Sequence, residues 1–164
     1  CIVKRICIFL LVSLAVLLLA QTAWAYDADS ARAFAQMFEP VRGAKAGKAL
    51  HMIKPEQLVE RVKKGEHIVA LDVRTPAESG FYGMTMPDTL AIPIDQLFLP
   101  ENLDRIPTDL PVLVVCKSGT RATAACTGLR YIGFENAYVL KGGIGALAGY
   151  LNPKTANMPL EDPR

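Results

Sequence analysis

A cysteine that opens a short polar loop is the residue of this chain best placed to do chemistry. Cys116 follows the apolar run 111–115, which predicts a buried strand, and the segment 120–131 beyond the loop predicts a helix. The thiolate of cysteine is the nucleophile, whereas a free thiol with a pKa of about 8.5 is mostly protonated at neutral pH. Cys116 is therefore a candidate for covalent catalysis if its neighbours favour the anion.

The five residues after the cysteine provide such neighbours: Lys117, Ser118, Gly119, Thr120 and Arg121. Gly119 permits a turn that directs backbone N–H groups inward, and the following helix adds the positive end of its dipole. Lys117 and Arg121 add two cations, and Arg121 can bind an oxyanion through two hydrogen bonds. Such surroundings lower the pKa of a cysteine to roughly 3.5–7.5. The pattern favours a reactive thiolate over the alternative, a buried apolar cysteine at the end of a strand.

The first 25 residues predict a secretory signal peptide. Two basic residues precede the apolar stretch 6–20, and Ala-Trp-Ala at 23–25 provides a site for cleavage before Tyr26. The alternative is a retained membrane anchor, but the apolar run is shorter than the about 20 residues that span a bilayer. We therefore expect a periplasmic or secreted protein with no stable membrane span once the signal is removed.

Length and charge set limits on the remaining chain. The 164 residues leave room for one ordinary domain. The formal net charge is +2, but two of the 18 basic residues and none of the 16 acidic ones lie in the predicted signal. The mature chain is therefore formally neutral and shows no basic stripe along the sequence, which argues against nucleic acid as a partner.

Two of the four cysteines, Cys116 and Cys126, lie beyond the signal. In an exported protein such a pair could form a disulfide. However, Cys116 ends a predicted strand and Cys126 lies more than a turn into the next helix, so we expect Cys126 to be a core thiol rather than a partner of Cys116. The histidines, His51 and His67, are isolated, so the sequence predicts no metal site and no cofactor.

Strands and helices are predicted to alternate along the chain, which is typical of an α/β fold with a mainly parallel sheet. In such sheets ligands bind beyond the carboxyl ends of the strands, where Cys116 is predicted to lie. The expected strands are 68–73, 112–115 and 137–140, with short extended segments near 50–53 and 90–94. The expected helices are 27–38, 55–64, one that begins at Thr75, 120–131 and 144–151. Residues 42–48 are expected to be a linker, and the tail after Asn152 is expected to be irregular.

Two sets of residues resemble the signatures of the rhodanese family. Leu71-Asp72-Val73-Arg74-Thr75-Pro76-Ala77-Glu78, followed by Ala91-Ile92-Pro93-Ile94, resembles the first signature. The segment 115–122 around Cys116, then 129–134 and the Val-Leu-Lys-Gly-Gly sequence at 139–143, resembles the second half. The similarity extends from about Leu50 to Leu151. It divides the chain into a signal peptide (1–25), an N-terminal helix and linker (26–48), a rhodanese-like domain (49–151) and a C-terminal tail (152–164).

The resemblance implies both a fold and a reaction. It implies a mainly parallel sheet of about five strands with helices on both faces, and transfer of sulfane sulfur through a persulfide on Cys116. Residues 117–121 would form the substrate-binding cradle, whereas Asp72, Arg74 and Glu78 match polar residues that support the fold. The expected partners are a small anionic sulfur donor such as thiosulfate and a cyanide or thiol acceptor, with a periplasmic acceptor protein as a further candidate.

The chain also departs from the family pattern. Residues 83–91 replace the usual Gly-His-Ile element and contain no histidine, and Gly145-Ala146 stands where an aromatic residue often follows the paired glycines. Both changes lie near the predicted rim of the site, where they bear on substrate identity.

Two other functions are alternatives to sulfur transfer. A cysteine phosphatase or arsenate reductase places five residues between its cysteine and arginine, whereas four separate Cys116 from Arg121 here, so the cradle suits one terminal sulfur. A binding module, or a carrier that passes persulfide sulfur to a partner protein, is the second alternative. Because Cys116 is present, a carrier is favoured over a module that only binds.

Overall fold

The structure, a computed structural model, describes residues 26–159, so the predicted signal peptide lies outside the described residues. Contacts divide the chain after Gln36 into two compact units, which are described separately. The described part of the first unit consists mostly of helix α2 (Ala28–Phe38), close to the predicted range 27–38. Its first turn is capped by Asp27, whose Oδ1 accepts a hydrogen bond of 2.6 Å from the Ser30 N–H.

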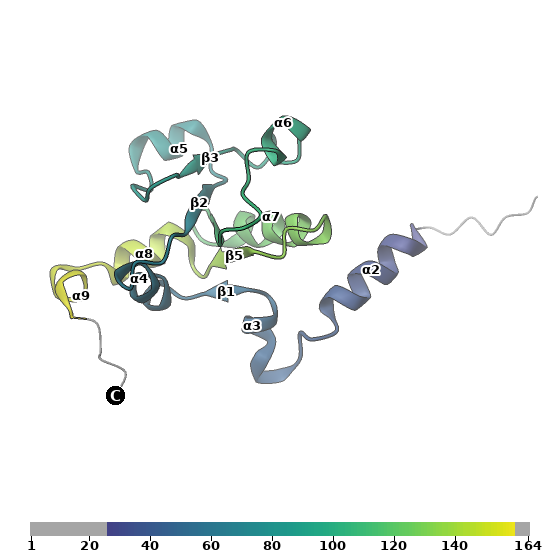
Figure 1. Cartoon of the computed structure of the whole chain (residues 1–164), viewed down its shortest axis with the longest axis horizontal. Coiled ribbons are helices and arrows are strands. Elements are labelled where there is room, and N and C mark those ends of the chain that lie inside the picture. Colours follow the sequence, from purple (N-terminus) through teal and green to yellow (C-terminus); the bar gives the residue numbers. More distant parts are fainter. Residues whose placement is uncertain (1–25, 160–164) are drawn as a thin grey trace, which may run out of the picture. The chain divides into compact units, whose positions relative to one another are not determined.

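The second unit contains a parallel sheet of five strands, which confirms the predicted α/β class (Figure 1). The strand order is β1-β5-β4-β2-β3, and every neighbouring pair is parallel. The strands are β1 (Met52–Ile53), β2 (Val69–Asp72), β3 (Leu90–Ala91), β4 (Val112–Val115) and β5 (Ala137–Leu140). β4 is paired on both sides and all four of its residues are buried, as expected of a central parallel strand.

Helices cover both faces of this sheet. On one face, α7 (Thr120–Tyr131) packs Ala125, Cys126 and Leu129 against Val112 and Val114. On the other face, α4 (Pro55–Lys63) and α8 (Gly143–Tyr150) pack against Leu113 and Val115. Successive residues of a strand point to opposite faces, so β4 supplies both cores.

Local sequence explains where the helices beside the site begin. α5 (Pro76–Phe81) starts with proline at its first position, and the Thr75 side chain accepts a hydrogen bond from the Glu78 N–H. The Glu78 carboxylate in turn accepts one from the Thr75 N–H, which completes a capping box. The short helix α6 (Pro100–Leu103) also begins with proline.

Besides α6, two segments contain helix that the sequence did not predict. The predicted linker 42–48 includes a 3₁₀ turn, η1 (Gly43–Lys45), and most of the short helix α3 (Ala46–Ala49). The tail, predicted to be irregular, contains α9 (Pro153–Asn157), which Asn152 caps by accepting the Thr155 N–H.

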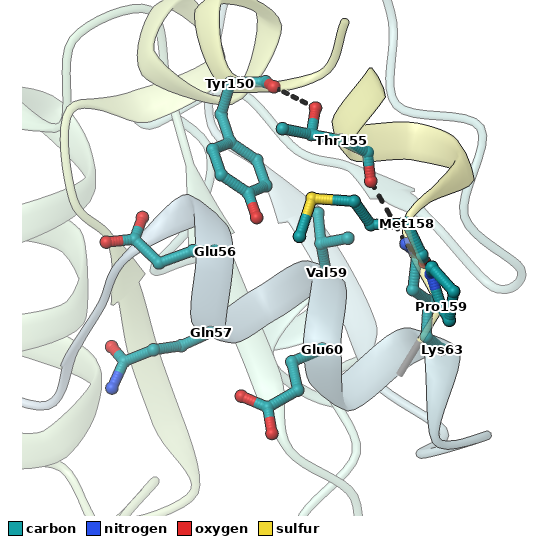
Figure 2. Close-up of a pocket in the computed structure, with 9 residues that line it drawn as sticks. All are labelled: Glu56, Gln57, Val59, Glu60, Lys63, Tyr150, Thr155, Met158 and Pro159. Atoms are coloured by element: carbon teal, nitrogen blue, oxygen red, sulfur yellow. Dashed lines mark hydrogen bonds between the residues drawn. The ribbon is translucent and has the colours of Figure 1, made fainter. Parts of the chain in front are cut away.

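A lysine of α4 holds α9 in place. Lys63 Nζ donates hydrogen bonds to the backbone oxygens of Thr155 (3.1 Å) and Met158 (2.6 Å), and Thr155 Oγ1 donates to the Tyr150 oxygen. Figure 2 shows the resulting cavity of about 220 Å³ between α4 and α9. These contacts span 92 and 95 residues, so local propensity could not reveal them. Within residues 26–159, none of the helices is both long enough and apolar enough to span a bilayer.

Candidate active site

Cys116 lies directly after β4, at the carboxyl end of the sheet, and is 1% exposed. Its Sγ accepts a hydrogen bond of 3.1 Å from the backbone N–H of Gly119. Gly119 has a φ of 94°, a left-handed conformation that glycine adopts at little cost, and it is the N-cap of α7. The loop therefore turns at least one backbone amide toward the sulfur, at the positive end of a helix of 12 residues.

The carbonyl groups of the loop point the opposite way, toward α8. The Cys116 oxygen accepts a hydrogen bond of 2.9 Å from the Ile144 N–H, and the Lys117 oxygen accepts one of 3.1 Å from the Gly145 N–H. In a planar trans peptide the C=O and the next N–H point in opposite directions. The N–H groups of Lys117 and Ser118 therefore point away from α8, which leaves them available to an anion in the loop.

The paired glycines after β5 make this close approach possible. A Cβ atom on Gly143 would lie 2.3 Å from the Cys116 oxygen, and Gly143 has a φ of 62°. A Cβ on Gly119 would lie 3.2 Å from the Gly142 nitrogen. The loop of Cys116 and the start of α8 thus fit together because these positions lack side chains.

Arg121 is held by Glu78 in a two-pronged ion pair. Its Nη1 and Nη2 donate hydrogen bonds of 2.8 and 2.6 Å to the two carboxylate oxygens of Glu78. These bonds, followed by those from Thr75, hold the pKa of the Glu78 carboxyl well below its usual range. The pair joins α5 to α7 across 43 residues of sequence and offsets the charge of Arg121, which the sequence predicted to bind an anionic substrate.

Asp72 and Arg74 form a buried ion pair beside this contact. They are 2% and 5% exposed, and Arg74 Nε and Nη2 donate to the two oxygens of Asp72 at 2.9 and 2.7 Å. Burial acts to raise the pKa of Asp72, but hydrogen bonds from Arg74 and Ser79 outweigh it and the net pKa is lowered. Arg74 Nη2 also donates to the Tyr82 oxygen at 2.5 Å, so the pair is bonded to Ser79 within α5 and to the residue that ends this helix. Ser79 and the Tyr82 backbone had not been singled out in the sequence.

The remaining loop residues face outward. Lys117, Ser118 and Thr120 are exposed, and the hydroxyl oxygens of Ser118 and Thr120 lie 3.3 Å apart. Among the described residues, no carboxylate forms an ion pair with Lys117. Lys117 is therefore the loop's unneutralised cation.

Cys126 is a core thiol, as predicted. It is buried against the sheet and not bonded to Cys116, and burial raises its pKa to about 12. His51 Nδ1 lies 3.1 Å from the Ala137 oxygen and His67 Nε2 lies 2.9 Å from Asp88, so both histidines have hydrogen-bond partners away from the loop. In the part of the chain that the structure describes, no group of three potential ligands could hold a metal ion.

Gly143 contacts the loop of Cys116 but was not predicted from the sequence to be a site residue. The pair Gly142-Gly143 is part of the family resemblance, but its contact with Cys116 depends on tertiary packing. The sequence did contain one indication of this contact. Gly143 follows a predicted strand of the same sheet as the strand that precedes Cys116.

Comparison with known proteins agrees with this arrangement. Residues 54–149, more than half of the chain, match the rhodanese-like domain. A sulfurtransferase of Allochromatium vinosum is 36% identical over 104 residues, which cover 63% of this chain and 94% of that protein. The probable adenylyltransferase/sulfurtransferase MoeZ of Mycobacterium tuberculosis is 30% identical over 62% of this chain, but the match spans only 25% of MoeZ.

Solved structures show the same fold. The crystal structure of a rhodanese-related protein from Thermoplasma volcanium superposes with a TM-score of 0.53 and 29% identity, covering 63% of this chain and 95% of that one. The family match, residues 54–149, includes strands β2 to β5 and the cysteine loop described above. The chain belongs to the rhodanese-like domain family.

Proposed function

We propose that the protein is a sulfurtransferase that carries sulfane sulfur as a persulfide on Cys116. The observation that carries this proposal is the Gly119 N–H directed at Sγ, in a loop whose carbonyls are bonded to α8. An anion on Sγ, or on a second sulfur attached to it, would be stabilised by backbone dipoles without a general base. The relationship to the Allochromatium vinosum sulfurtransferase supports sulfur transfer in general.

The reaction would proceed in two displacements. The Cys116 thiolate attacks the outer sulfur of a donor such as thiosulfate; the new S–S bond forms as the donor S–S bond breaks, and sulfite leaves with the electron pair. The product is the anion Cys116–S–S⁻. Cyanide or a thiolate then attacks the outer sulfur, forms thiocyanate or a new persulfide, and restores the Cys116 thiolate.

Charge and access at the loop fit a small anionic donor. Arg121 is engaged by Glu78, so Lys117 supplies the unneutralised positive charge at the mouth of the loop. Cys116 is almost completely buried, whereas Lys117, Ser118 and Thr120 around it are exposed. The donor would therefore present one terminal sulfur at the centre of the loop and leave its charged groups at the rim.

The cellular setting is proposed from the sequence. The N-terminal pattern of residues 1–25 supports export to the periplasm or beyond, with a retained membrane anchor as the alternative. In that setting the acceptor would be a small thiol, cyanide or an exported protein thiol.

The direct test is sulfur loading measured by intact mass. Protein that begins at Tyr26 is incubated with thiosulfate, and we expect a gain of one sulfur atom that cyanide removes as thiocyanate. Cys116→Ser should gain nothing. Cys126→Ser is the matched control and should load normally, because Cys126 is buried in the core. Failure of the first protein to load from a panel of sulfane donors, or hydrolysis of a phosphate ester in its place, would refute the proposal.

A further inference from the structure

A cavity lined by several basic side chains lies along β1, an edge strand of the sheet. We call it the cationic cavity. It has a volume of about 540 Å³ and is lined by Gly47, Lys48, His51, Met52, Ile53, Lys54, Gln57, Arg61, Tyr138 and Lys141. Four of these residues are lysine or arginine, namely Lys48, Lys54, Arg61 and Lys141, and none is aspartate or glutamate. The cavity thus gathers positive charge in a chain that is formally neutral beyond its predicted signal.

Only some of these basic groups have their charge offset. Arg61 binds Glu66 and lies 5.4 Å from the centre of the Tyr138 ring, and Lys54 Nζ is 3.8 Å from a Glu56 oxygen. Lys48 and Lys141 form no ion pair with any residue in the described range 26–159. These two lysines provide the uncompensated charge of the cavity.

Two stacked rings, those of His51 and Tyr138, line the cavity. The His51 ring stacks on Tyr138 with a centroid distance of 5.1 Å, and His51 Nδ1 is bonded to the Ala137 backbone oxygen. Burial, followed by the nearby charge of Arg130, lowers the pKa of His51, so this ring is neutral at neutral pH. Attraction of an anion there depends on the lysines and not on His51.

The sheet places this cavity next to the candidate active site. Lys141 directly follows β5, and its N–H donates a hydrogen bond of 2.8 Å to the Ile53 oxygen at the end of β1. Continuing the β4–β5 register, in which Val114 pairs with Val139, brings Lys141 opposite Cys116. The next residue, Gly142, packs against Gly119 of the loop.

The distance between the two sites indicates the kind of occupant. β1 lies two strands from β4, and neighbouring strands are about 4.8 Å apart, so the β1 backbone that lines the cavity lies roughly 10 Å from the strand that ends at Cys116. A small anion bound beside β1 therefore cannot also reach the sulfur. An extended peptide rises about 3.3 Å per residue, so about three residues would bridge Cys116 and the part of the cavity beside β1.

We propose that the cationic cavity docks an acidic segment of a partner protein whose cysteine, about three residues away, exchanges sulfur with Cys116. This inference rests on the proposed sulfur transfer and specifies its partner. The carboxylates nearest the partner's cysteine would pair with Lys141, and those farther along the segment with Lys48, which precedes β1 and lies at the far end of the cavity from Cys116. The partner's thiolate would take the outer sulfur of the persulfide. The Cys116 thiolate would be restored and a persulfide formed on the partner.

The test uses three synthetic peptides that each carry one cysteine, with a run of Glu, Gln or Lys beginning three residues away. Persulfide-loaded protein is mixed with each peptide, and the rate of sulfur transfer is measured. The result is expressed as the rate with the Glu peptide divided by the rate with the Gln peptide. We expect a ratio of about 10 at low ionic strength that falls toward 1 at about 0.5 M salt, since exposed charges are screened over a few ångströms there. The Lys peptide should be slowest.

The matched variants are Lys48→Glu, in the cavity, and Lys154→Glu, on α9 and outside the cavity lining. Lys48→Glu should lower the ratio of the Glu-peptide rate to the Gln-peptide rate to about 1, whereas Lys154→Glu should leave this ratio unchanged. An equal loss in both variants, or a ratio of 1 in the unmodified protein, would overturn the docking site. Transfer of sulfur to cyanide, measured alongside, shows whether the proposed function itself holds.

A binding measurement decides the question even if no persulfide forms. A fluorescent Glu peptide with serine in place of cysteine is titrated with unloaded protein and followed by anisotropy. We expect saturable binding that Lys48→Glu weakens about tenfold. Tighter binding of a labelled single-stranded RNA than of the Glu peptide, with the same dependence on Lys48, would assign the cavity to a different class of partner and refute the proposal.

Discussion

Replacement of Gly143 by alanine is expected to disable sulfur transfer without touching the cysteine. Gly143 contacts the backbone of the Cys116 loop and has a φ of 62°. The alanine methyl group would be placed 2.3 Å from the Cys116 oxygen and 2.6 Å from the Lys117 carbonyl carbon. Both atoms belong to the backbone, so no side-chain rotation can relieve the contact.

The size of the effect follows from these distances. Cβ contacts are essentially never shorter than 3.0 Å. The loop and α8 must therefore separate by at least about 0.7 Å, which lengthens the 2.9 Å bond from Ile144 to Cys116 to about 3.6 Å, beyond hydrogen-bonding range. Displacement of a reacting group on this scale costs roughly 100-fold in rate. The left-handed backbone costs about 1–2 kcal/mol and each lost hydrogen bond about 1 kcal/mol, so we expect a loss of about 2–4 kcal/mol in the free energy of unfolding.

Thiocyanate formation from thiosulfate and cyanide measures the rate, and urea unfolding measures the stability. Gly149→Ala is the matched control, because Gly149 lies in the same helix and a Cβ there would meet no atom within 4 Å. This control should keep its rate and gain about 0.5–1 kcal/mol, the usual preference for alanine over glycine inside a helix. A folded Gly143→Ala protein that transfers sulfur within twofold of the original would refute the role assigned to the contact between α8 and the loop.

Two further results are expected from the polar contacts around α5. Asp72→Asn should lower the free energy of unfolding by about 3–5 kcal/mol, because it leaves the buried Arg74 guanidinium without its counter-charge. The pKa of Asp72 is lower in the folded protein than in the unfolded chain. The stabilisation that Asp72 provides is therefore present above the unfolded pKa of about 3.9 and is lost as pH falls through the folded pKa. In urea titrations, the free energy of unfolding of Asp72→Asn should fall less steeply with acid than that of the original protein, and an equal dependence on pH would contradict this. Glu78→Gln should release Arg121 and raise kcat/KM for thiosulfate about twofold to fivefold, as expected for one partly exposed ion pair. The kcat/KM for an uncharged sulfane donor should stay unchanged. Equal changes for both donors would show that the ion pair acts only on loop structure.

Local sequence determined most of the elements. Strands β4 and β5 and helix α7 have the predicted bounds, because each is a continuous apolar run or a helical pattern whose signals lie within a few residues. The position of Cys116 after a buried strand, before a glycine and a helix, was enough to predict a loop that favours a thiolate. The helix α9 was missed although Asn152 and Pro153 give a local signal for its start, because a helix of five residues also depends on contacts with Lys63, more than 90 residues away.

The tertiary structure decided what surrounds that cysteine. Sequence alone predicted Arg121 as an anion-binding group, but folding brings Glu78 to it from 43 residues away and offsets its charge. Folding also presses Gly143 against the Cys116 carbonyl and gathers scattered lysines into the cationic cavity. A chain's local pattern fixes periodicity, caps and turns, which depend on neighbouring residues. Ion pairs, close backbone approaches and charged surfaces depend on which strand lies beside which, and only the packed sheet sets that order.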